Sequence, residues 1–253
     1  MEMRGMMGGF YRISEWIMRL SVTNVLWIIC SIPFWFFSIV LLQASTPGEV
    51  YAAFLPMAIV APFTLFPATG AMYTVARKWV MGEVDVPLLK TFFRGYKENY
   101  KQSMLGGILY TILIGILAVD FYVYQKEINL LSYVFIALIA LLFVSMFNYF
   151  SMMVHYHMKT LQLLKNAILL TIGKPFRSIS AAIMAGAVVF FSTRFTFLIP
   201  FFMMAVIAYL TFWNFYMIYQ KLQEQAERAK QEADNAESSE DLEMLDTEGS
   251  SNK

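Results

Sequence analysis

The topology of this chain depends on residues 178–219, which read SISAAIMAGAVVFFSTRFTFLIPFFMMAVIAYLTFWNFYMIY. Arg194 is the single charged residue of this segment. As one helix the segment would extend about 63 Å, roughly twice the thickness of the hydrocarbon core of a membrane. We therefore expect two helices that turn near Arg194, over residues 178–193 and 195–219.

Four further segments that are predominantly apolar precede this pair. We expect membrane spans near residues 22–43, 51–76, 103–124 and 130–154. The composition agrees, because 58% of the residues are hydrophobic and 15% are charged, unlike those of water-soluble domains. The sequence therefore predicts an all-α polytopic membrane helix bundle of about six transmembrane helices, with a membrane domain over residues 22–219.

The distribution of basic residues predicts the orientation of the bundle. Lys and Arg number 19, and all but Lys126 and Arg194 fall in the N-terminal segment, in the second and fourth connections, or after the last span. Cytoplasmic connections of membrane proteins are enriched in Lys and Arg. We therefore expect a multi-pass protein of the cell membrane with both termini in the cytoplasm.

The segments on either side of the membrane domain differ in character. Residues 1–21 are predicted to form a cytoplasmic N-terminus with an amphipathic interfacial segment, because apolar residues recur there at helical spacing. Residues 224–253 hold 3 Lys and Arg against 10 Asp and Glu. Residues 220–253 are therefore predicted to be an acidic cytoplasmic tail, helical at first and disordered from Ser238 onward.

Prolines interrupt the span over residues 51–76 at Pro56, Pro62 and Pro67, and each proline removes a backbone donor. One interpretation is a ligand or ion site at a broken helix, formed by Thr64, Pro67 and Thr69 at a new helix N-terminus near Pro67. The other is a kink, with the threonine hydroxyls bonded to freed carbonyls. The kink is favoured, because this span holds no acidic residue to complete an ion site.

The connection after this span is rich in basic and aromatic residues. The candidate docking residues are Arg77, Lys78, Lys90, Phe92, Phe93, Arg94, Tyr96, Lys97, Tyr100 and Lys101. The aromatic residues recur at helical spacing among the basic ones, which is typical of an amphipathic helix on anionic lipid. Docking onto the cytoplasmic face of a partner protein is the alternative.

Small and amide side chains predict contacts between helices within the bundle. Small residues repeated every four positions allow helices to approach closely in lipid. One such stripe consists of Ser103, Gly107, Thr111 and Gly115. The amides of Asn24, Asn148 and Asn214 are expected to bond between helices rather than to bind a substrate.

Catalytic chemistry has little support in this sequence. His155 and His157 would point about 200° apart on a helix, so they are poorly placed to share a metal ion. Cys30 is the only cysteine, which excludes an intramolecular disulfide. The sequence contains no nucleotide-binding or hydrolase motif. We expect no enzyme activity, no cofactor, no metal site and no nucleic-acid partner.

One run of motifs resembles a known family. It consists of FPATGAMY at 66–73, VARKW at 75–79, GE at 82–83, DVP at 85–87 and KTF at 90–92, with NVLW at 24–27 upstream. These motifs are similar to those of the YesL-like family of bacterial multi-pass membrane proteins, a domain of unknown function. The resemblance covers most of residues 5–215. It implies an integral membrane protein without established catalytic residues, often encoded beside carbohydrate-binding lipoproteins, sugar permeases and polysaccharide-degrading enzymes.

The resemblance favours an accessory or assembly component of a carbohydrate (oligosaccharide) uptake system, with the lipid bilayer and a sugar ABC permease or another membrane protein as partners. Two alternatives stay open. A small-solute secondary transporter would place its pathway beside the proline-rich span, and a membrane-embedded sensor would signal through the acidic tail.

Overall fold

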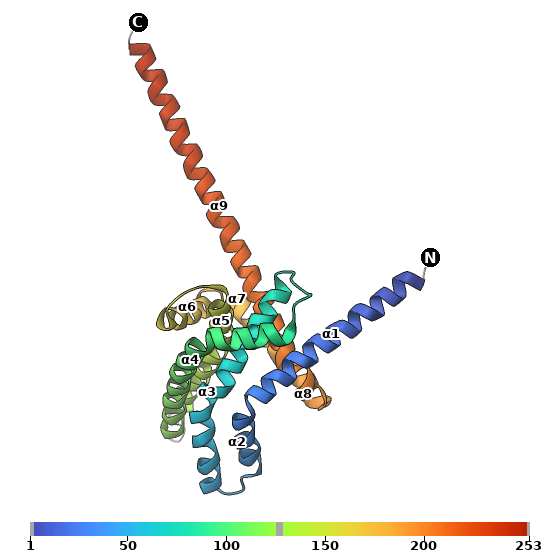
Figure 1. Cartoon of the computed structure of the whole chain (residues 1–253). Helices are drawn as coiled ribbons and strands as arrows, with labels where there is room; N and C mark the ends of the chain where they lie inside the picture. Colours follow the sequence, from blue (N-terminus) through green and yellow to red (C-terminus); the bar gives the residue numbers. More distant parts are fainter. Residues whose placement is uncertain (1–2, 125–128, 252–253) are drawn as a thin grey trace. The chain divides into compact units, whose positions relative to one another are not determined.

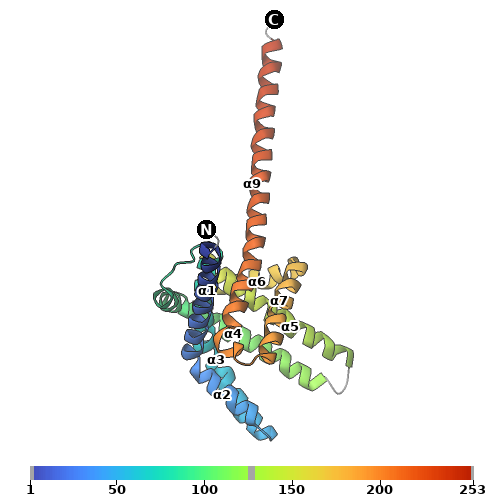
Figure 2. The ribbon, with the colours of Figure 1, turned by 90° about the vertical axis from the view of Figure 1, so that its right-hand side faces the viewer.

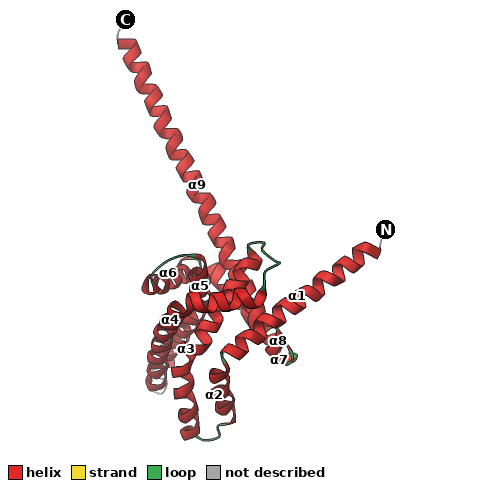
Figure 3. Cartoon of the chain, in the orientation of Figure 1, coloured by secondary structure: helices red, strands yellow, loops and turns green. Residues whose placement is uncertain are grey.

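The computed structural model describes residues 3–124 and 129–251, which are helical apart from short loops (Figure 3). Along the chain these helices are α1 (Met3–Cys30), α2 (Ile32–Gln43), α3 (Pro47–Val80), α4 (Leu88–Tyr124), α5 (Asn129–His155), α6 (Thr160–Gly173), α7 (Pro175–Arg194), α8 (Leu198–Phe201) and α9 (Met203–Ser251) (Figure 1). The chain divides into two compact units, Met1–Asn214 and Phe215–Lys253.

Five of the described helices are long and apolar enough to cross a membrane. They are Tyr11–Cys30 within α1, α3, α4, Leu131–His155 within α5, and α7. The protein is therefore an all-α polytopic membrane helix bundle, as predicted. The segment 195–219, which was expected to supply a sixth crossing, lies in α8 and the first part of α9 and is not among the five. Its threonine, asparagine and tyrosine residues lower its mean hydropathy.

The segment 22–43, for which one membrane span was expected, is divided between two helices, because α1 ends at Cys30 and α2 begins at Ile32. Pro33 is the physical reason, since it has no N–H to bond the carbonyl of Ile29. Ser31 leaves the helical conformation between the two helices, and its hydroxyl donates to the carbonyl of Trp27 over 2.6 Å. Beyond this break α2 packs beside α3 (Figures 1 and 2).

Glycines allow α3 and α4 to approach each other closely. A Cβ atom on Gly107 would lie 2.9 Å from the Cα of Pro62 and 2.7 Å from the Cγ of Phe66. A Cβ atom on Gly95 would lie 2.6 Å from the hydroxyl of Thr74. The small-residue stripe of α4 is thus confirmed as a close contact at Gly107. At Gly115 the prediction is wrong, because a Cβ atom there would meet nothing within 4 Å.

A second helix break separates α8 from α9 at Phe202, and Asn24 of α1 bonds to both sides of it. Its Nδ2 donates to the carbonyls of Ile199 over 3.1 Å and Pro200 over 2.7 Å. Its Oδ1 accepts the backbone N–H groups of Met204 and Ala205, each over 3.0 Å. One buried amide therefore satisfies four backbone groups that the break leaves without helical partners.

The other two predicted amide contacts also join separate helices. Asn148 of α5 donates to the hydroxyl of Thr171 in α6 over 2.9 Å. Asn214 donates to the carbonyl of Arg177 and to the hydroxyl of Ser180, both in α7. All three asparagines therefore hold helices together within the first unit.

The second unit continues α9 to Ser251. Residues 220–232 are exposed along this helix. The expected loss of helix from Ser238 onward does not occur in the structure. Residues 240–245 read EDLEML, and their glutamate, leucine and methionine residues have high helix propensity.

Candidate functional site

The predicted broken-helix site lies in an unbroken helix. α3 continues through Pro56, Pro62 and Pro67, so the new helix N-terminus expected near Pro67 is not formed. Pro67 frees the carbonyl of Phe63 from its helical partner. The hydroxyl of Tyr100 in α4 donates to this carbonyl over 3.3 Å. Another helix thus supplies the missing partner, and no pattern in the sequence indicated that pairing.

The two threonines of this predicted site have different surroundings. Thr64 donates to the carbonyl of Val60 in its own helix over 3.1 Å. Thr69 donates to the carbonyl of Leu65 over 2.8 Å and accepts the indole N–H of Trp27 in α1 over 3.0 Å. Thr69 is therefore buried at a contact between helices, whereas Thr64 bonds within α3 alone.

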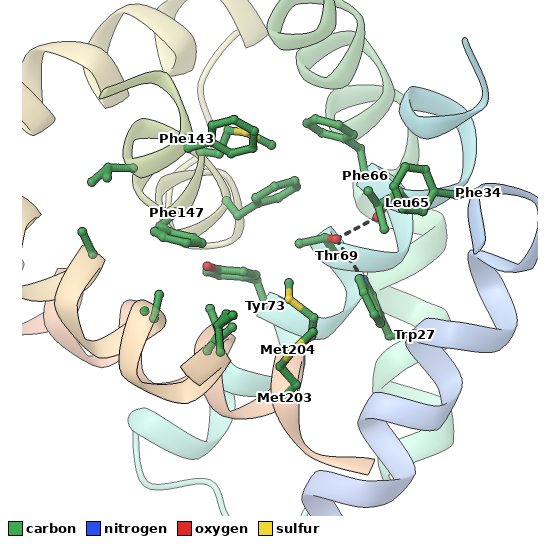
Figure 4. A pocket seen from close by; sticks show the side chains of 18 of the residues that line it. Trp27, Phe34, Leu65, Phe66, Thr69, Tyr73, Phe143, Phe147, Met203 and Met204 are labelled. Atoms are coloured by element: carbon green, nitrogen blue, oxygen red, sulfur yellow. Dashed lines mark hydrogen bonds between the residues drawn. The ribbon is translucent and has the colours of Figure 1, made fainter. Parts of the chain in front are cut away.

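A cavity of about 680 Å³ lies beside Thr69, among α1, α2, α3, α5, α7 and α9 (Figure 4). This volume is within the range of small-molecule pockets, roughly 300–1,000 Å³. Most of its lining consists of aromatic and aliphatic side chains and methionines, and none of the lining residues that the structure describes is charged. This cavity could not be predicted from the sequence, because its lining comes from helices far apart along the chain.

Most polar groups at the cavity already have partners. The indole of Trp27 bonds to Thr69, and the hydroxyl of Tyr73 lies 2.7 Å from that of Thr211. Trp35 Nε1 is buried without a hydrogen-bond partner in the part of the chain that the structure describes. Among the described residues, no three His, Cys, Asp or Glu side chains lie close enough together to hold a metal ion. The cavity is therefore suited to an apolar ligand.

The candidate docking residues 77–101 lie on two helices and the loop between them. Arg77 and Lys78 are in the last turn of α3, and the other eight are in the first part of α4. Nζ of Lys78 donates to the carboxylate of Glu83 over 2.6 Å. This hydrogen bond and the charge of Lys78 hold the pKa of Glu83 below its usual value. Lys78 is therefore paired with a residue of the loop that follows α3.

The first part of α4 presents one exposed side. This side, which we name the α4 basic face, consists of Lys90, Phe93, Arg94, Lys97 and Lys101. The other aromatic candidates face inward to differing degrees. Phe92 is fully buried, and Tyr96 and Tyr100 are half-buried. The aromatic part of the predicted docking surface is thus reduced to Phe93.

An ion-pair cluster that no sequence pattern predicted joins α1 to the loop before α4. Arg19 is buried and bonds to the carboxylates of Glu15 and Asp85. Trp16 packs edge-on against Trp79, with ring centroids 5.6 Å apart. Arg19 and Asp85 are 66 residues apart, so no local pattern could have paired them.

Membrane-crossing helices around an apolar cavity define the class of this chain, an all-α polytopic membrane protein. Residues 20–121 match the family model described as "Protein of unknown function, DUF624". The chain is 31% identical over 214 residues to the uncharacterized protein YteU of Bacillus subtilis (strain 168), covering 83% of this chain and 84% of YteU. The chain therefore belongs to this family.

Two other proteins of Bacillus subtilis (strain 168) are similar. The uncharacterized protein YesL is 29% identical over 71% of this chain and 74% of its own length. The uncharacterized protein YesV is 29% identical over 54% of this chain and 67% of its own length. The predicted YesL-like resemblance is confirmed by these matches. No solved structure matches the chain significantly.

Proposed function

We propose that this protein is a non-enzymatic accessory or assembly component of a carbohydrate uptake system in the bacterial cell membrane. The carbohydrate part of the proposal rests on the gene association that the family resemblance implies. The accessory part rests on the chemistry of the cavity, whose described lining is apolar and uncharged. Sugar hydroxyls that leave water need hydrogen-bond partners. This cavity therefore disfavours a sugar pathway and favours a role through the protein's surface.

The α4 basic face is the docking surface that we propose. Lys90, Arg94 and Lys97 are exposed around Phe93, and the ion pairs recorded among the described residues do not include them. A partner with an acidic face, such as a sugar ABC permease, would meet these charges and bury the phenyl ring of Phe93. Charge complementarity would select the partner, and the aromatic ring would contribute binding energy.

Affinity purification in mild detergent from the native host tests this proposal. The wild-type chain should recover permease subunits, identified by mass spectrometry. The charge reversals Lys90→Glu, Arg94→Glu and Lys97→Glu, made together, should abolish that recovery. A matched control reverses Lys159 and Lys165, which are also exposed and should not affect it.

Two results would contradict the proposal. The first is a wild-type chain that recovers no permease although the purified protein carries sugar into liposomes, which would identify a transporter. The second is equal recovery of the permease by the α4 variant and the control, which would exclude the α4 basic face.

A further inference from the structure

The cavity beside Thr69 has an exposed mouth and a buried floor. Ala140 and Phe143 of α5 and Gly186 and Val189 of α7 line it and are exposed. Phe143 is 53% exposed and Val189 is 42% exposed. The mouth therefore opens on the side of the bundle, between two helices that are apolar enough to cross the membrane.

Buried aromatic rings form the floor of the cavity. Phe66, Tyr73 and Phe150 all line it, and each is at most 5% exposed. The ring of Phe150 lies 5.7 Å from that of Phe66 and 5.4 Å from that of Tyr73, measured between centroids. Figure 4 shows Phe66 and Tyr73 on α3 and Phe147 on α5, around the same space. A ligand that reaches this floor leaves the bilayer for a protein interior.

The height of the mouth limits what can enter. Ala140 and Phe143 lie near the middle of Leu131–His155, and Gly186 lies near the middle of α7. In a hydrocarbon core about 30 Å thick, this position is near the midplane, roughly 15 Å from either headgroup layer. The molecules that meet the mouth are therefore the ends of lipid chains, and their headgroups stay outside.

The volume argues against a helix of a partner protein as the occupant. An α-helix is about 10–12 Å wide with its side chains and rises about 5.4 Å per turn. A cavity of about 680 Å³ could hold little more than one such turn. A flexible hydrocarbon chain has no comparable limit, and it needs no polar partner.

We propose that this cavity binds the terminal part of a phospholipid acyl chain, which enters laterally between α5 and α7. The chain end lies against Phe66, Tyr73 and Phe150, and the headgroup stays in its own leaflet. This site does not depend on the accessory role proposed above, because it concerns a lipid and a different surface of the molecule.

Photolabelling of the full chain in liposomes tests the proposal. The probe is phosphatidylglycerol with a diazirine near the methyl end of one acyl chain, and labelled residues are mapped by peptide mass spectrometry. We expect adducts on the buried residues Tyr73 and Phe150. A probe with its diazirine beside the glycerol should not reach them, because the mouth lies near the midplane.

Two glycines offer matched variants for this experiment. A Cβ atom meets nothing within 4 Å at Gly186 or at Gly115, but Gly186 alone lines the cavity. Gly186→Phe should fill the mouth and eliminate labelling of the floor, and Gly115→Phe should leave that labelling unchanged. Native mass spectrometry should show a lipid retained by the wild type and by Gly115→Phe and lost from Gly186→Phe, at equal thermal stability.

Three outcomes would overturn the proposal. Adducts confined to exposed residues such as Ile112 and Ile116 would mean that lipid only surrounds the bundle. Floor labelling that survives Gly186→Phe would mean that the chain does not enter by this mouth. Floor labelling by diazirine-bearing palmitic acid but not by the phospholipid would assign the cavity to free fatty acids.

Discussion

The two sides of α3 are built in opposite ways. Toward α4, the backbones approach so closely that Gly107 has no room for a Cβ atom. Toward α5 and α7, the side chains of α3 border an open cavity. Lipid gives helices no hydrophobic reason to associate, so close packing and hydrogen bonds must hold them together. The close packing against α4 therefore stabilises the bundle, and the cavity side of α3 has room for the acyl chain proposed above.

The largest expected loss of stability comes from placing a side chain between α3 and α4. Gly107→Leu should destabilise the protein by about 3 kcal/mol, the upper end for overpacking, because the backbone of Pro62 stands in the way. Thermal unfolding in detergent micelles measures this loss. The control Gly115→Leu should be neutral or slightly stabilising, because glycine is a poor helix former. Equal losses at Gly107 and Gly115 would contradict the close packing of α3 against α4 at Gly107.

A smaller effect is expected on the cavity side. Thr69→Val leaves the buried indole N–H of Trp27 without its acceptor, which should cost about 1–3 kcal/mol. Thr64→Val should cost little, because the Thr64 hydroxyl bonds only within its own helix. The same unfolding measurement distinguishes the two variants. In a double-mutant cycle, Thr69→Val should cost less in a Trp27→Phe background than in the wild type, because the indole N–H is then absent, and equal costs would contradict the role of this bond.

The smallest effect tests the partner of the carbonyl that Pro67 frees. Tyr100→Phe removes the hydroxyl that bonds to the carbonyl of Phe63. A typical hydrogen bond contributes about 0.5–1.5 kcal/mol, and this one is long at 3.3 Å, so we expect a loss below about 1 kcal/mol. Tyr96→Phe is the matched control, and its unfolding temperature should stay at the wild-type value. If Tyr96→Phe lowers the stability more than Tyr100→Phe does, the hydrogen bond to the carbonyl that Pro67 frees is not what stabilises this contact.

The sequence predicted the features that depend on local periodicity. The lengths of the apolar segments predicted membrane helices, and the four-residue spacing of small side chains predicted the contact at Gly107. The same spacing failed at Gly115, because a repeated pattern does not tell which of its members has a neighbouring helix. The helical spacing on α4 likewise predicted an amphipathic segment, but not that Phe92 would turn inward and Phe93 outward.

Features that depend on distant partners could not be predicted in the same way. Asn24 was expected to bond between helices, but its partners are more than 170 residues away. The break at Phe202 has Pro200 as its only local signal, and three prolines in α3 gave a stronger signal without breaking that helix. Prolines break a helix only where packing does not hold it, and packing is a property of the whole bundle.

The bonds of Asn24 also bear on how the chain is made. α1 is synthesised and inserted long before residues 199–205 leave the ribosome, so the amide of Asn24 initially enters the bilayer without these partners. A bare amide in hydrocarbon is costly, and this cost is relieved only when α8 and the start of α9 arrive. The first helix to enter the membrane is thus among the last to reach its final packing. It does so when Asn24 bonds to residues 199–205.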